Sequence, residues 1–108
     1  MDLMTQRDML EFEKSAGEAA RLLSALANER RLLILCTIVD REVSVGELQA
    51  QIGISQSALS QHLAILRTQG LVTTRRKAQT IYYRLASDEA RQVIQTLANI
   101  YCPPASGI

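Results

Sequence analysis

Apolar and polar positions follow a helical period over most of the chain. In the first 26 residues, apolar side chains recur every three or four positions, which predicts a helix over residues 7–26. Asn28 and Ser44 are good N-caps, so two more helices are predicted over residues 29–39 and 45–52. Residues 40–43 between them are expected to form a turn.

The clearest break in this pattern is Gly53-Ile54-Ser55. A glycine suits the left-handed residue that closes a helix, and a serine suits the N-cap of the next helix. The following helix, predicted over residues 56–68, places Leu59, Leu63 and Leu66 on one face. Two helices joined by a short glycine-containing turn, the second with a polar outer face, match the helix-turn-helix.

After residue 70 the period changes from helical to extended. Residues 71–75 and 80–85 are rich in β-branched and aromatic side chains, and they flank a polar tip at residues 76–79, which predicts a β-hairpin. A last helix, capped by Ser87, is expected to end near Tyr101. The order ααααββα predicts a mainly α winged helix-turn-helix, with the hairpin as its wing, in a single domain over residues 1–108.

Charge is distributed unevenly, although the formal net charge is only +1. Residues 1–52 have a balance of −3, whereas residues 53–87 carry five cations and no carboxylate. Such a basic segment within a near-neutral chain is the footprint expected of a surface that meets nucleic-acid phosphate. A solvated basic surface without a partner is the alternative that charge alone leaves open.

The predicted helix-turn-helix and wing supply side chains suited to double-stranded DNA. Short hydrogen-bonding side chains can enter the major groove, and a glutamine can pair with adenine through two hydrogen bonds. Cations on the wing would bind phosphate or the minor groove, which positions the protein rather than specifying a sequence. For His62, the only histidine, a packed and hydrogen-bonded role beside the core face is the alternative. The candidate DNA-binding residues are Ser44, Gln56, Ser57, Ser60, Gln61, His62, Arg67, Arg75, Arg76, Lys77 and Gln79.

Four segments carry a resemblance to a known family: residues 22–32 (LLSALANERRL), residues 55–63 (SQSALSQHL), Gly70-Leu71-Val72 and residues 80–83 (TIYY). They are similar to the ArsR/SmtB repressors, and the resemblance spans about residues 15–102. It implies a homodimer formed through the first and last helices that binds a palindromic operator and releases it when an inducer arrives. A dimer would also cover the apolar faces of these two helices and supply the two-fold symmetry of a palindrome.

Many members of that family sense metals, through a cysteine pair on the first helix of the helix-turn-helix or an Asp/His set on the last helix. Residues 45–51 contain no cysteine, and residues 87–101 contain Asp88 and Glu89 but no histidine. Carboxylates alone make a poor site for zinc or soft metals. No metal site and no cofactor are therefore expected.

The two cysteines, Cys36 and Cys102, are 66 residues apart. From residue chemistry alone both could be inert thiols, with Cys36 packed as a small hydrophobic residue. The resemblance changes this interpretation, because one branch of the family carries a cysteine at this position of the second helix and another at the end of the last helix. The resemblance implies a redox switch in which sulfane sulfur or an oxidant links Cys36 to Cys102, through a disulfide or a polysulfide bridge, and DNA is released. A thiol at a helix C-terminus, however, feels the negative end of the dipole, which raises its pKa.

These observations favour a DNA-binding transcriptional regulator, either a repressor or an anti-silencer, over three alternatives. The first is an ArsR-type regulator with inert cysteines and another inducer, such as a metal. The second is a winged-helix protein-interaction module, which would need a hydrophobic or acidic outer face on residues 56–68. The third is a thiol enzyme, which would need a base beside its nucleophile.

No apolar stretch approaches the ~18 residues of a membrane span, and the polar N-terminus does not resemble a signal peptide. A cytoplasmic location without a membrane partner is expected.

Overall fold

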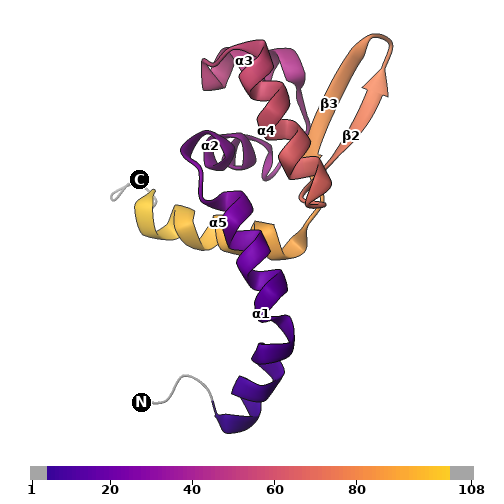
Figure 1. Cartoon of the computed structure of the whole chain (residues 1–108). Helices are drawn as coiled ribbons and strands as arrows, with labels where there is room; N and C mark the ends of the chain where they lie inside the picture. Colours follow the sequence, from indigo (N-terminus) through magenta and orange to yellow (C-terminus); the bar gives the residue numbers. More distant parts are fainter. Residues whose placement is uncertain (1–4, 103–108) are drawn as a thin grey trace.

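The computed structural model describes residues 5–102, so both ends of the expected domain, residues 1–4 and 103–108, lie outside the described part. Residues 5–102 form five helices and three short strands (Figure 1). In chain order these are α1 (Gln6–Leu26), α2 (Glu29–Ile38), β1 (Val43–Ser44), α3 (Val45–Ile52), α4 (Gln56–Thr68), β2 (Val72–Lys77), β3 (Thr80–Leu85) and α5 (Asp88–Tyr101).

Side-chain caps determine where the helices begin. Asn28, Ser44, Ser55 and Ser87 each accept a hydrogen bond from the backbone N–H three residues further on. A cap of this kind stabilises a helix by about 1 kcal/mol. Gly53 ends α3 at φ +74°, a left-handed conformation that glycine adopts without steric cost. Every predicted helix boundary is confirmed to within one residue.

The segment expected as a turn contains a strand that the sequence pattern did not predict. Val43 and Ser44 form β1, which pairs antiparallel with Tyr83 and Tyr82 of β3. The sheet therefore has the order β1-β3-β2. A two-residue strand has no period of its own, and β1 exists only because β3 offers it hydrogen-bond partners.

The wing is confirmed as an antiparallel hairpin, but its tip is shorter than expected. β2 continues through Arg76 and Lys77, and Lys77 pairs with Thr80 of β3. Only Ala78 and Gln79 remain in the turn, with Ala78 at φ +56°. The two cations therefore lie on the end of a strand whose ladder fixes their backbone.

The core is apolar and joins α2, α3, α4, the sheet and α5. The apolar side chains that join the two helices of the helix-turn-helix are all buried: Leu48 and Ile52 of α3, and Leu59, Leu63 and Leu66 of α4. Each such side chain stabilises the fold by about 2 kcal/mol when it leaves water. No polar or charged side chain within residues 5–102 is buried. Because the buried leucines of α4 lie on one face, its opposite face must point to solvent.

Most of α1 lies outside this core. Only Ala25 and Leu26 of its 21 residues are buried, and Figure 1 shows its N-terminal half extending away from the other elements. None of the helices in residues 5–102 combines the length and the apolar character needed to cross a bilayer. Large apolar side chains are nevertheless exposed on the two end helices, at Met9, Leu10, Phe12 and Leu23 of α1 and at Ile100 and Tyr101 of α5.

Candidate nucleic-acid interface and thiol pair

The outer face of α4 is polar and open to solvent. Gln56, Ser57, Ser60 and Gln61 are all exposed, as the helical period predicts. α4 contains no carboxylate, and the Oγ atoms of Ser57 and the N-cap Ser55 lie 3.4 Å apart. Amide and hydroxyl side chains both donate and accept, so this face can match the mixed donors and acceptors of base edges.

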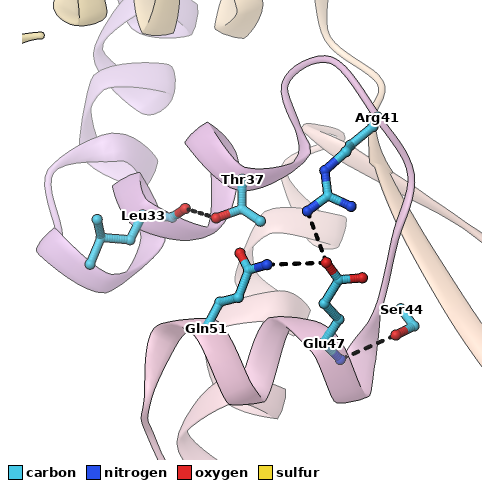
Figure 2. A network of polar contacts seen from close by, with 6 residues as sticks. All are labelled: Leu33, Thr37, Arg41, Ser44, Glu47 and Gln51. Atoms are coloured by element: carbon cyan, nitrogen blue, oxygen red, sulfur yellow. Dashed lines mark hydrogen bonds and ion pairs between the residues drawn. The ribbon is translucent and has the colours of Figure 1, made fainter.

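Ser44 begins the first helix of the helix-turn-helix, within a small polar network (Figure 2). Its Oγ accepts from the backbone N–H of Glu47 at 3.1 Å. The Glu47 carboxylate accepts from Arg41 at 2.9 Å and from Gln51 at 3.1 Å, which ties α3 to the loop after α2. On α2 itself, Thr37 donates to a backbone carbonyl of its own helix. Ser44 therefore acts as a cap, and its own O–H proton remains available to a phosphate oxygen.

Three cations flank the face of α4. Arg67 is exposed in the last turn of α4, and Arg76 and Lys77 are exposed at the far end of β2. None of the ion pairs formed within residues 5–102 involves these three side chains. Gln79 is exposed in the turn of the wing. The three cations are thus available for phosphate contacts, which position a protein on DNA.

Arg75 differs from the other candidate cations because it is already paired. Its Nε donates to both carboxylate oxygens of Glu42 at 3.0 and 3.1 Å, and its Nη2 donates to Glu42 Oε1 at 2.7 Å. The guanidinium also lies 5.0 Å from the centroid of the Tyr82 ring. These hydrogen bonds, with the attraction between the charges, lower the pKa of Glu42 and raise that of Arg75. Residues 53–87 lack a carboxylate, but the fold brings Glu42 to them from outside.

His62 is half-buried, and its Nδ1 lies 3.4 Å from Nη1 of Arg31 on α2. Burial lowers the pKa of His62, and the charges of Arg31 and Arg30 lower it further, so the imidazole is neutral at neutral pH. The alternative of a packed and hydrogen-bonded histidine therefore applies to the Nδ1 side of the His62 ring, which contacts Arg31. Arg31 was not among the residues singled out from the sequence.

The two thiols are exposed and free. Partial burial raises the pKa of the Cys36 thiol, and the neighbouring Cys102 raises it further, so the fold brings these two residues into each other's electrostatic reach. Because Cys36 is on the surface, the alternative in which it packs as a core residue is wrong. The pKa of Cys36 is therefore raised, as expected, but the causes are burial and the second thiol rather than the helix dipole. Both effects keep Cys36 protonated at neutral pH and slow its reactions as a nucleophile.

Within residues 5–102, no three His, Cys, Asp or Glu side chains gather into a group that could hold a metal ion.

Comparison with known proteins decides the family. Residues 28–74 match the family described as bacterial regulatory protein, arsR family. The chain is also 54% identical over 95 residues to the transcriptional activator HlyU of Vibrio cholerae, covering 88% of each protein. The chain belongs to the arsR family. Another similar member, the biofilm growth-associated repressor of Xylella fastidiosa, is 48% identical over 99 residues, which cover 92% of this chain and 84% of that protein.

Solved structures of the family share the fold. HlyU from Vibrio cholerae superposes with a TM-score of 0.81 at 56% identity, covering 83% of this chain and 98% of that chain. The transcriptional repressor BigR from Xylella fastidiosa gives a TM-score of 0.82 at 48% identity, covering 92% of this chain and 98% of that chain. A homodimeric winged helix-turn-helix domain from Mycobacterium bovis gives 0.69 at 28% identity, covering 93% of this chain and 89% of that chain.

Membership of the arsR family has two consequences for the expectations above. The predicted winged helix-turn-helix is confirmed, and so is the expectation of a transcriptional regulator rather than an enzyme. The curated relatives include both an activator and repressors, so the family does not by itself give the direction of regulation.

Proposed function

We propose that the protein is a homodimeric regulator that binds operator DNA through α4 and the wing. We also propose that a covalent link between Cys36 and Cys102 makes the protein dissociate from the DNA. The observation that carries the DNA-binding part is the outer face of α4, which is exposed, rich in Gln and Ser, and free of carboxylates. Arg67 at its end and the wing cations add phosphate ligands on either side.

Dimerisation is supported by the uncovered apolar side chains of α1 and α5. Apolar side chains that gather on one surface mark interaction sites in proteins. A relative with the same fold is described as homodimeric. Two copies related by a two-fold axis would place their α4 helices in successive major grooves, with half-sites about 34–36 Å apart.

The DNA-binding part is tested with a duplex that the wild-type protein selects from a random-sequence pool. We expect affinity to fall steeply as salt rises, because phosphate contacts release counterions. Gln56→Ala and Gln61→Ala should each reduce the preference for the selected duplex by about 1–3 kcal/mol. Gln95→Ala, which removes an exposed glutamine of α5, is the matched control and should change nothing. Equal effects of all three substitutions would rule out base recognition by α4.

The switch is supported by two thiols that are exposed and within electrostatic reach of each other. With peroxide, the two thiols lose two protons and two electrons to form a disulfide, and the peroxide becomes two waters. With a persulfide donor, one thiolate attacks the sulfane sulfur and the donor leaves as a thiol. The second thiolate then attacks the cysteine sulfur of the new persulfide and expels hydrosulfide, which leaves the same disulfide.

This linkage would tie α2 to the end of α5 and alter the spacing of the two α4 helices in the dimer. We expect wild-type protein to leave the selected duplex on treatment with polysulfide or peroxide and to return after reduction. Cys36→Ser and Cys102→Ser should bind equally well but stay bound, as measured by fluorescence anisotropy with intact-protein mass measurement. If both variants are released normally, the cysteines are inert and another inducer acts.

A further inference from the structure

A single guanidinium on α2 connects α1 to α4. Nε of Arg31 donates to the carbonyl of Ala25 at 2.6 Å, and its Nη2 donates to the carbonyl of Ser24 at 3.4 Å. Both carbonyls belong to the last turn of α1, which has no basic residue of its own. Arg31 therefore supplies the cation that the C-terminal end of a helix favours. Its remaining nitrogen, Nη1, lies 3.4 Å from Nδ1 of His62.

The chemistry of this contact fixes the position of a proton. A guanidinium has only donors and does not deprotonate in proteins, so Nδ1 of His62 must be the acceptor. A neutral imidazole that accepts at Nδ1 carries its proton on Nε2. The charged groups that act on the ring are Arg31 and Arg30 of α2, and α4 offers no carboxylate that would hold an imidazolium. The ring is therefore held neutral, with its donor on the nitrogen that does not contact Arg31.

His62 follows Ser60 and Gln61 on α4, and it is half-exposed. We propose that Arg31 is a positioning residue for DNA recognition: it holds His62 as the Nε2–H tautomer, so that α4 presents a hydrogen-bond donor to DNA. This inference rests on the proposed DNA-binding role of α4. The partner is an acceptor atom, which in DNA is a phosphate oxygen or a base-edge atom such as guanine O6 or N7.

The first test needs no DNA. His62 is the only histidine, so the nitrogen resonances of its ring are unambiguous in an NMR spectrum of the reduced protein. We expect an unprotonated Nδ1 and a protonated Nε2 at neutral pH. Arg31→Met should give a mixture of tautomers. Arg30→Met is the matched control, because it removes a cation that also acts on His62 but whose guanidinium donates to the carbonyl of Ile52. A proton on Nδ1 in the wild type, or an unchanged tautomer in Arg31→Met, would overturn the proposal.

The second test asks whether the donor reaches DNA, by anisotropy titration with the selected duplex and with a scrambled one. Glutamine can place an N–H near the position of Nε2, whereas asparagine reaches only as far as Nδ1. We expect His62→Gln to retain most of the affinity and His62→Asn to lose about tenfold. Losses on both duplexes would identify a phosphate partner, and a loss on the selected duplex alone would identify a base edge. Wild-type affinity in His62→Asn would overturn the role in recognition.

Arg31 itself is tested with two substitutions, because Arg31→Met also removes the cap of α1. Arg31→Lys keeps the charge near the α1 carbonyls but cannot reach three acceptors at once. We expect both variants to lose about tenfold in affinity for the selected duplex, while Arg30→Met loses less than Arg31→Met. Wild-type affinity in a folded Arg31→Lys protein would overturn the positioning role. If the wild type binds no DNA in a salt-dependent way, the proposed function fails and the recognition role with it, while the nitrogen resonances still decide the Arg31–His62 contact.

Discussion

At the scale of single residues, Arg75 is held by two contacts of different character. Its hydrogen bonds to Glu42 depend on an ionised carboxylate, whereas its position over the Tyr82 ring does not. If Arg75 turned to a DNA phosphate, it would exchange one anion for another. Its contribution to salt-dependent binding should therefore be smaller than that of Arg76 or Lys77, which have no ion-pair partner in the described part of the chain.

The Glu42–Arg75 pair predicts a stability difference that depends on pH. Because the pKa of Glu42 is lower in the folded chain than in the unfolded one, the pair stabilises the fold above the unfolded pKa. This stabilisation is lost as pH falls through the folded value. We expect Glu42→Gln to be less stable than wild type at neutral pH and equally stable once the carboxyl is protonated, as measured by urea unfolding at several pH values. Glu13→Gln, an exposed carboxylate of α1, is the control, and a difference that persists in acid would contradict this assignment.

Part of the site could be predicted at this scale and part could not. The exposure of Gln56, Ser57, Ser60 and Gln61 follows from helical period alone. Glu42–Arg75 and Arg31–His62 join residues 33 and 31 positions apart, and no local pattern encodes such a contact. Both involve long, flexible arginine side chains, whose partners are determined only when the elements pack.

At the scale of elements, the helices could be predicted because their ends are local. Asn28, Ser44, Ser55 and Ser87 cap them through bonds that span three residues, and Gly53 closes α3 by its own backbone conformation. β1 could not be predicted, since its pairing with β3 depends on the whole fold. The predicted tip of the wing, residues 76–79, is two residues too long. Charged side chains such as Arg76 and Lys77 are typical of loops, although here their backbone continues the β-ladder.

The turn of the wing contains a strained residue. Ala78 has φ +56°, a left-handed conformation that costs a residue with a Cβ roughly 1 kcal/mol. Ala78→Gly should therefore raise the free energy of unfolding by about 0.5–1 kcal/mol, as measured by urea unfolding. Ala64→Gly, at an exposed position within α4, should lower it by about 1 kcal/mol and serves as the control. A decrease at both positions would mean that the turn is not strained.

At the scale of the whole molecule, the chain is more extended than its length requires. Its radius of gyration is 16.2 Å, whereas a compact chain of this length has about 13 Å. Figure 1 shows why: the N-terminal half of α1 projects away from the other elements and increases the radius of gyration. A monomer would expose Met9, Leu10 and Phe12 to water at a cost that a second copy would remove.

This surface predicts a dimer that one charge can disrupt. We expect the wild type to sediment as a dimer at micromolar concentration and Phe12→Asp to sediment as a monomer, because a carboxylate would have to be buried without a partner. Ile65→Asp alters a similarly exposed apolar residue of α4 and should leave the dimer intact. Phe12→Asp should also bind the selected duplex more weakly, since half-site contacts would no longer be linked. A monomeric wild type would contradict the proposed assembly.

The shallow anchoring of α1 has a consequence for the lifetime of the protein. In one copy, only the last turns of this helix are held by the core, and a helix segment of about 15 residues is marginally stable in water by itself. Its amide hydrogens should exchange rapidly and its backbone should be open to proteases until a second copy arrives. A surplus of protein would then persist as protected dimers, while scarce copies would be degraded from their N-terminal helix.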